Sequence, residues 1–164
     1  MASTYTTNIR LTKQGDGDNA NTWGEILNNV ISLVDQAVGT YTTITVGATS
    51  SVALTENSGS GDQARSAILE IAGTVGGAHT SIFVYLPSGA SKTYAIKNAV
   101  SANTTASDAV VLRVAGQTHG VTVPTGGIGY FFTNGTSVNS LNAAGFSAIT
   151  TTQADAKYVA LAGT

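Results

Sequence analysis

Residues 81–99, SIFVYLPSGASKTYAIKNA, contain two runs, 81–86 and 92–99, that are rich in strand-forming residues and read with a period of two. Comparable runs follow one another at intervals of roughly ten residues, a spacing typical of an all-β sandwich or barrel. They cover residues 41–46, 51–56, 66–72, 109–115, 120–123 and 128–133. The sequence therefore predicts a mainly β fold, an antiparallel β-sandwich of about eight short strands.

One hairpin is specified more closely than the others. Asn134-Gly135 separates residues 131–133 from residues 136–138. Asn and Gly both accept positive φ angles, so this dipeptide predicts a type I′ turn. The sheet is expected to end near Leu141.

Residues 22–39 have the pattern of a single amphipathic helix. Thr22 and Glu25 have the spacing of a capping box at its start, and Gly39 fits a cap at its end. Apolar residues recur in steps of three and four, which predicts one apolar stripe. The stripe is formed by Trp23, Ile26, Leu27, Val30, Ile31, Val34, Ala37 and Val38. Trp23, in the first turn, is expected either to pin the helix onto the sheet or to insert into a neighbouring subunit.

The composition argues against several classes of protein. Only 10% of the 164 residues are charged, the formal net charge is −2, and there is no cysteine. Disulfide scaffolds and thiolate metal sites need cysteine, and a nucleic-acid-binding protein needs a basic surface, so neither class is expected. No apolar run approaches the roughly 20 residues that span a bilayer. A surface with so little charge gives weak protection against self-association, and we expect copies or a partner to cover part of it.

No catalytic or cofactor motif is found, so the sequence predicts a protein that is not an enzyme and has no cofactor or metal. His79 and His119 have no acidic or serine partner in a known pattern, and the segment 15–19 matches a calcium loop poorly. Aromatic residues of the strands favour a role in the core or in an interface, with a sugar-stacking platform as the alternative. These are Tyr85, Tyr94, Tyr130, Phe131 and Phe132.

The chain divides into four parts. Residues 1–21 are expected to be an extended arm and loop, residues 22–39 the helix, and residues 40–142 the β-sandwich domain. Residues 143–164 predict a short helical stalk that is too weakly apolar to be stable alone and gains most by packing against copies of itself. Its candidate oligomerisation residues are Ile149, Tyr158, Val159 and Leu161.

Motifs at both ends resemble those of tailed-bacteriophage fibre and appendage proteins. The stretch TYTTNIRL at 4–11, followed by NTWG at 21–24, is similar to the N-terminal region of such proteins. The stretch QADAKYVALAG at 153–163 is similar to a short repeat of tail fibres. Further segments resemble successive strands of the same β domain. These are ARSAILEIAGT at 64–74, YAIKN at 94–98, GVTVP at 120–124 and FTNGT at 132–136.

This resemblance implies a non-catalytic, homotrimeric component of the virion that attaches to the particle through its N-terminal region. The expected partners are a tail adaptor, a portal or nozzle protein, or a capsid protein. The candidate docking residues are Tyr5, Ile9, Leu11 and Trp23. Three alternatives stay open: a head-decorating fibre, a carbohydrate-binding module that contacts a host surface glycan, and, ranked last, a hydrolase of cell-surface glycan. Neither nucleic acid nor a membrane is an expected partner.

Overall fold

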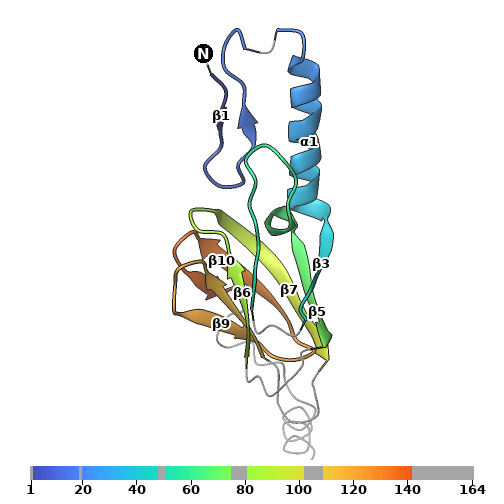
Figure 1. The fold of residues 1–164 in the computed structure, drawn as a ribbon, viewed down its shortest axis with the longest axis vertical. Coiled ribbons are helices and arrows are strands. Elements are labelled where there is room, and N and C mark those ends of the chain that lie inside the picture. The colour runs from blue at the N-terminus through green and yellow to red at the C-terminus, as the bar shows by residue number, and fades with distance from the viewer. Residues whose placement is uncertain (1, 19, 48–50, 75–80, 102–108, 142–164) are drawn as a thin grey trace, which may run out of the picture.

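The computed structural model describes residues 2–18, 20–47, 51–74, 81–101 and 109–141, and in these ranges the chain is mainly β with a single α-helix and several sheets. Figure 1 shows an elongated molecule in which the helix α1 (Trp23–Gly39) and the N-terminal segment lie beyond one end of the two larger sheets. The predicted C-terminal stalk, with Ile149, Tyr158, Val159 and Leu161, lies outside the described residues.

Nine strands form the two larger sheets, and two short strands form a separate pair. The five-stranded sheet has the order β11 (Val138–Ser140), β10 (Ile128–Asn134), β7 (Ser91–Ser101), β5 (Ile68–Thr74), β3 (Tyr41–Thr45). The four-stranded sheet has the order β4 (Ser51–Ala53), β6 (Ser81–Leu86), β8 (Ala109–Val114), β9 (Gly120–Val123). The pair is β1 (Thr4–Tyr5) with β2 (Thr12–Lys13), and a 3₁₀ helix η1 (Gln63–Arg65) precedes β5.

The predicted strand positions agree with the structure, but the expectation of purely antiparallel sheets is wrong. β3 pairs with β5, β5 with β7, β4 with β6, and β6 with β8, all in parallel. Parallel neighbours in one sheet are therefore joined by connections that include a strand of the other sheet, whereas β8 and β9, and β10 and β11, follow each other directly. Period-two patterning identifies a strand but not its neighbour or its direction, which depend on contacts distant in sequence.

The inward-facing side chains of both sheets form one apolar cluster. In β6, β7 and β8 alternate residues are buried, as the strand period requires. Leu69, Ile96 and Leu112 are fully buried members of this cluster, and the Tyr94 ring joins them while its hydroxyl donates to the carbonyl oxygen of Ala64 at 2.8 Å.

The hairpin between β10 and β11 is present, with a different turn from the one predicted. Thr133 pairs with Val138, so the two central residues of the turn are Gly135 and Thr136. Gly135 has φ of +86°, and Thr136 is not among the residues with positive φ. A positive φ at the first central position alone is the pattern of a type II′ turn, whereas type I′ needs two.

The helix α1 covers neither sheet. Thr22 occupies the N-cap position without a side-chain capping bond, so the predicted capping box does not form. Leu33 is the one buried residue of α1, and it is absent from the stripe predicted from the sequence. The inward face of the helix meets η1 and the loop before it instead of a sheet.

Candidate interaction surfaces

The N-terminal segment folds back as a hairpin instead of forming the extended arm expected from the sequence. Thr4 pairs with Lys13 and Tyr5 with Thr12, and the Thr6 amide donates to the Leu11 carbonyl oxygen at 2.8 Å. Each strand of the hairpin has no other strand beside it within the ranges that the structure describes. The outer edges of β1 and β2 are thus the parts of this segment that an added strand could pair with.

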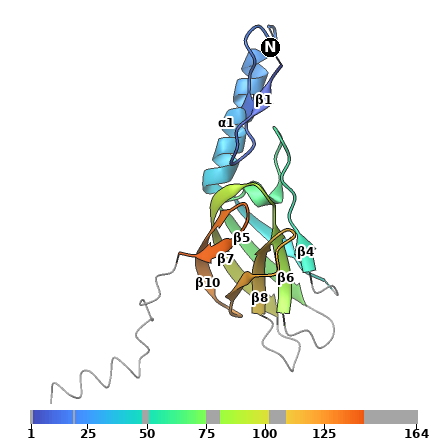
Figure 2. The ribbon, with the colours of Figure 1, turned by 90° about the vertical axis from the view of Figure 1, so that its left-hand side faces the viewer.

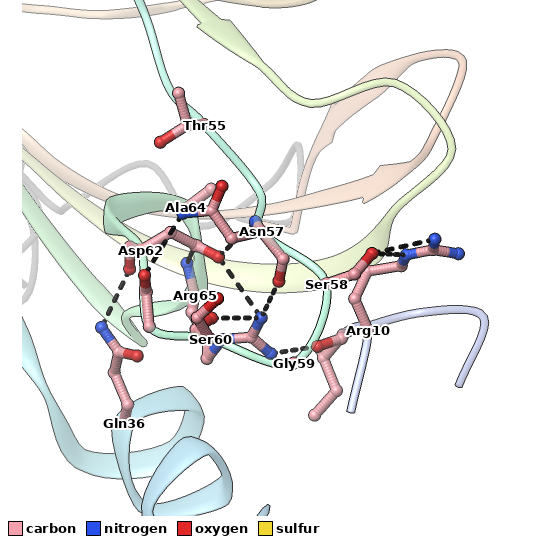
Figure 3. Close-up of polar contacts among 12 residues, drawn as sticks. Arg10, Gln36, Thr55, Asn57, Ser58, Gly59, Ser60, Asp62, Ala64 and Arg65 are labelled. Atoms are coloured by element: carbon pink, nitrogen blue, oxygen red, sulfur yellow. Dashed lines mark hydrogen bonds and ion pairs between the residues drawn. The ribbon is translucent and has the colours of Figure 1, made fainter. Parts of the chain in front are cut away.

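A buried arginine joins this hairpin to the loop at 57–62, as Figure 3 shows. The Arg65 guanidinium donates to the carbonyl oxygens of Ile9, of Asn57 at 2.8 Å and of Ser60 at 3.1 Å. It also lies 3.3 Å from the Asp62 carboxylate, and the two side chains are 1% and 0% exposed. A buried charge needs such partners, so Arg65 holds the hairpin at Ile9 and the loop at two points, Asn57 and Ser60.

Further hydrogen bonds hold the same loop to the hairpin and to α1. The Gly59 amide donates to the Arg10 carbonyl oxygen at 2.9 Å, and the Arg10 side chain donates to Ser58 Oγ. On the other side, Asn29 and Gln36 of α1 donate to the carbonyl oxygens of Gly59 and Asp62. The loop therefore lies between hairpin and helix and is hydrogen-bonded to both.

The four predicted docking residues do not form one patch. Tyr5 is 43% exposed, with the Arg10 guanidinium 5.5 Å from its ring centre. Ile9 and Leu11 are half-buried in the hairpin, and the Ile9 carbonyl is held by Arg65. Trp23 is 59% exposed, so it does not pin the helix onto the sheet.

The apolar residues of α1 are divided between two faces. The outer face carries an apolar stripe that we define as Trp23, Leu27, Ile31, Val34 and Val38, exposed by 41% to 75%. Each residue advances the helix by about 100°. Gln36 and Asn29, which contact the loop, each follow a stripe residue by two positions and so lie about 200° away from it. The stripe thus faces away from the hairpin and loop.

The outer face of the five-stranded sheet continues this apolar surface. Tyr41, Ile68, Ala95 and Tyr130 are aligned across β3, β5, β7 and β10 by the strand register. Leu141 extends the alignment beyond β11, where its amide donates to the Tyr130 carbonyl oxygen. We call these five residues the apolar row. The next row along the strands contains the ion pair between Lys97 and Glu70, 2.7 Å apart, which limits the apolar surface on that side.

The exposed apolar side chains are concentrated on one side of the molecule. Of the eleven large ones in the described residues, five belong to the stripe, and five, the row members Tyr41, Ile68, Tyr130 and Leu141 together with Ile128, lie on this sheet face. In Figure 2, α1 and the strands β5, β7 and β10 lie to one side of β4 and β6. On the four-stranded sheet the outward Phe83 ring is covered by Arg113, 3.9 Å from its centre. A concentration of exposed apolar side chains on one side favours an interaction surface.

A polar cavity of about 400 Å³ lies near the base of α1. Its lining residues are Gln36, Thr42, Thr55, Asn57, Gly61, Asp62 and Gln63.

Titratable groups near this cavity have shifted pKa values. Burial raises the pKa of the Glu56 carboxyl, and the negative charge of Asp62 raises it further. Burial, together with the charge of Arg65, lowers the pKa of Lys92 to about 8, and the Lys92 ammonium donates to the carbonyl oxygens of Ala64 and Ser66. Asp62 accepts from two backbone amides as well as from Arg65. Its carboxylate is therefore part of the Arg65 junction, by which we mean the bonds that join the hairpin to the loop at 57–62.

The side chains considered for chemistry are dispersed. His119 is exposed on a loop, and His79 lies outside the described residues. No group of three or more potential metal ligands occurs within the described parts of the chain. The five aromatic residues considered as a sugar platform do not share a surface, because Tyr94 and Phe131 are in the core while Tyr85 and Tyr130 belong to different sheets.

No helix in the described ranges is long and apolar enough to cross a membrane. The chain matches no protein-family model, and comparison with curated proteins and with solved structures finds no match to either.

Proposed function

We propose that this protein is a structural component of a bacteriophage virion, a homotrimeric fibre or fibre-like appendage that docks on the particle through its N-terminal region and supports host attachment. Its β domain is a sandwich of the two larger sheets. The partners are two further copies of the chain and a tail adaptor, portal, nozzle or capsid protein. The proposal combines the resemblance of the N-terminal and C-terminal motifs with one observation on the structure.

That observation is the one-sided apolar surface formed by the stripe and the row. Together with Ile128 beside the row, a monomer would leave ten large side chains in water on one side of the molecule. Full burial of a Val, Leu or Ile side chain is worth about 1.5–3 kcal/mol, so covering a half-exposed one gives on the order of 1 kcal/mol. Symmetric copies cover such a surface without a second gene product. The elongated shape in Figure 1 suits a fibre.

The hairpin and the loop that supports it are the part we assign to docking on the virion. Tyr5 offers an exposed ring, and the outer edges of β1 and β2 offer backbone groups for strand addition. The junction around Arg65 holds these groups in a fixed position before a partner arrives, which reduces the ordering cost of binding.

The mass of the purified full chain in solution, measured by light scattering after size exclusion, tests the assembly. Three chains per particle is the expected result. A single chain at micromolar concentration would contradict the homotrimer. Docking is tested separately, by infecting with a phage whose gene for this chain lacks codons 2–21 and measuring the chain in purified virions. Loss from the virion with the three-chain mass retained supports N-terminal docking, whereas normal incorporation contradicts it.

A glycan-binding function is the second candidate, favoured by Tyr41 and Tyr130. Both rings are about half exposed in the same row, and they are separated by β5 and β7. Three strand spacings place them about 14 Å apart, so two sugar units of one chain could each stack on a ring. Calorimetric titration with host surface polysaccharide tests it, with Tyr130→Ala as the variant that should bind more weakly. Trimer assembly through the row would bury both rings and exclude this use.

A further inference from the structure

The spacing within the apolar stripe identifies what covers it. Leu27, Ile31, Val34 and Val38 are separated by four, three and four residues, the a and d spacing of a heptad repeat. All four are exposed. An a and d seam is complementary to a copy of itself, because each side chain inserts between those of an equivalent helix.

The residues beside the seam fit parallel copies. Asn28 and Asp35 flank it on one side and Val30 and Ala37 on the other. Across a parallel interface Asp35 therefore meets apolar groups and not a like charge, so no repulsion opposes the pairing. Basic residues are absent from α1, which offers no charge pattern that would select a helix of different sequence.

The seam and the sheet both bear on the number of copies. β-branched residues occupy both a positions, Ile31 and Val38, and one d position, Val34. β-branched residues at both a and d shift a parallel coiled coil from two strands toward three or four, whereas Leu at d, as at Leu27, favours two. The seam admits three strands, the number in the proposed homotrimer. A helix of 17 residues in a protein draws most of its stability from packing against other elements. The apolar row, which begins at Tyr41 only three residues after Val38, supplies the additional surface that such a short coil needs.

We infer that α1 forms a parallel three-stranded coiled coil with α1 of two further copies of this chain. Next to the C-terminal end of this coil, the apolar row packs against a neighbouring copy. This inference rests on the trimeric part of the proposed function and gives its interface. Asn29 and Gln36 hold the loop and hairpin on the face of α1 opposite the seam. Three hairpins therefore point outward around one end of the trimer axis, where a docking partner reaches them without disturbing the coil.

Disulfide trapping tests the seam, because the chain has no cysteine of its own. We would place one cysteine in the full-length chain as Leu27→Cys or Val38→Cys, with Ser32→Cys as the matched control. Ser32 is exposed on the same helix but lies about 140° from Leu27. The mass of each reduced variant is measured by light scattering, and its fold is checked by circular dichroism. The variant is then oxidised and run on a non-reducing gel.

The expected result is a three-chain mass for all variants and crosslinking of the two seam variants only. Three cysteines in one layer form one bond, so at completion about two thirds of the chains become disulfide-linked pairs. Val38→Cys also tests direction. Residue 38 is seven positions from the centre of α1, so antiparallel helices would hold two copies of it about 21 Å apart, beyond the roughly 7 Å between Cα atoms that a disulfide allows.

Each other outcome overturns a different statement. A three-chain mass without seam crosslinking beyond that of Ser32→Cys refutes the coiled coil and leaves the trimer of the proposed function in place. Crosslinking of Leu27→Cys without Val38→Cys refutes the parallel register over the whole seam. A two-chain mass with complete crosslinking refutes the third strand, and a single-chain mass refutes the assembly altogether.

Discussion

Replacing Arg65 by Met should destabilise the protein far more than the same replacement at Arg10. Arg65 is buried, donates to three backbone carbonyls and pairs with Asp62, whose side chain is also buried. The variant Arg65→Met leaves the three carbonyls without this donor, and leaves the Asp62 carboxylate with two backbone amides but without its positive partner. Removing one partner of a buried ion pair costs about 3–5 kcal/mol. A domain of this size is stable by only about 5–15 kcal/mol, so the loss is a large part of the total.

Arg10→Met is the matched control, because Arg10 also links the hairpin to the loop. Its side chain donates to Ser58 Oγ in an exposed position, at 3.0 and 3.2 Å. An exposed hydrogen bond of this kind contributes about 1 kcal/mol or less. A third variant, Arg65→Met with Asp62→Asn, also removes the negative charge of Asp62 that Arg65→Met leaves unpaired. It should recover part of the stability lost by Arg65→Met.

The assay is urea unfolding followed by circular dichroism, at one fixed chain concentration because assembly makes stability depend on it. Trypsin cleavage at Lys13 under native conditions provides a local readout, since a hairpin released from its junction opens more often. Faster cleavage is expected for Arg65→Met than for Arg10→Met. Equal free energies of unfolding and equal cleavage rates for the two variants would refute the reasoning that burial makes the Arg65 junction the main anchor.

Three further predictions follow from other parts of the molecule. Val34→Asp should reduce the three-chain mass to one chain by burying three carboxylates at the seam, whereas Ser32→Asp should leave it unchanged, as light scattering would report. Gly73→Ala should lower the midpoint temperature of thermal unfolding far more than Gly89→Ala. Both glycines have positive φ, which costs about 1–2 kcal/mol for alanine, but only at Gly73 does the added Cβ meet a backbone carbonyl oxygen. The free energy of unfolding should rise between pH 8 and 10, because the folded pKa of Lys92 is lowered to about 8 and the unfolded chain binds more protons there; Lys92→Met should remove this rise.

Much of the secondary structure was predictable because it is encoded locally. The strands at 81–86 and 120–123 have the predicted bounds, and α1 begins one residue after the predicted start. Pairing was not predictable, because parallel neighbours such as β3 and β5 are set by residues that approach only in the folded chain. The hairpin at 4–13 was missed for a related reason, since its anchor, Arg65, is distant in sequence.

The apolar pattern of the helix was recognised, but its division into two faces was not. Eight apolar positions in steps of three and four predict one stripe, which omits Leu33, the residue that is buried. Counted at about 100° per residue, Ile26 lies about 100° from Leu27 and close to Leu33. This angular spread was the signal that the helix has two apolar faces, one for its own chain and one exposed.

Separation of these two faces explains how one short helix could serve both assembly and docking. The face with Leu33, Asn29 and Gln36 is committed to the loop and hairpin, while the stripe remains exposed on the opposite face. Loss of Arg65 should therefore release the hairpin without abolishing the coil, whereas loss of the seam should leave each hairpin folded on its own chain. If Arg65→Met at low denaturant gave monomers with an intact helix, the two faces would be coupled and the division of roles proposed for α1 would be wrong.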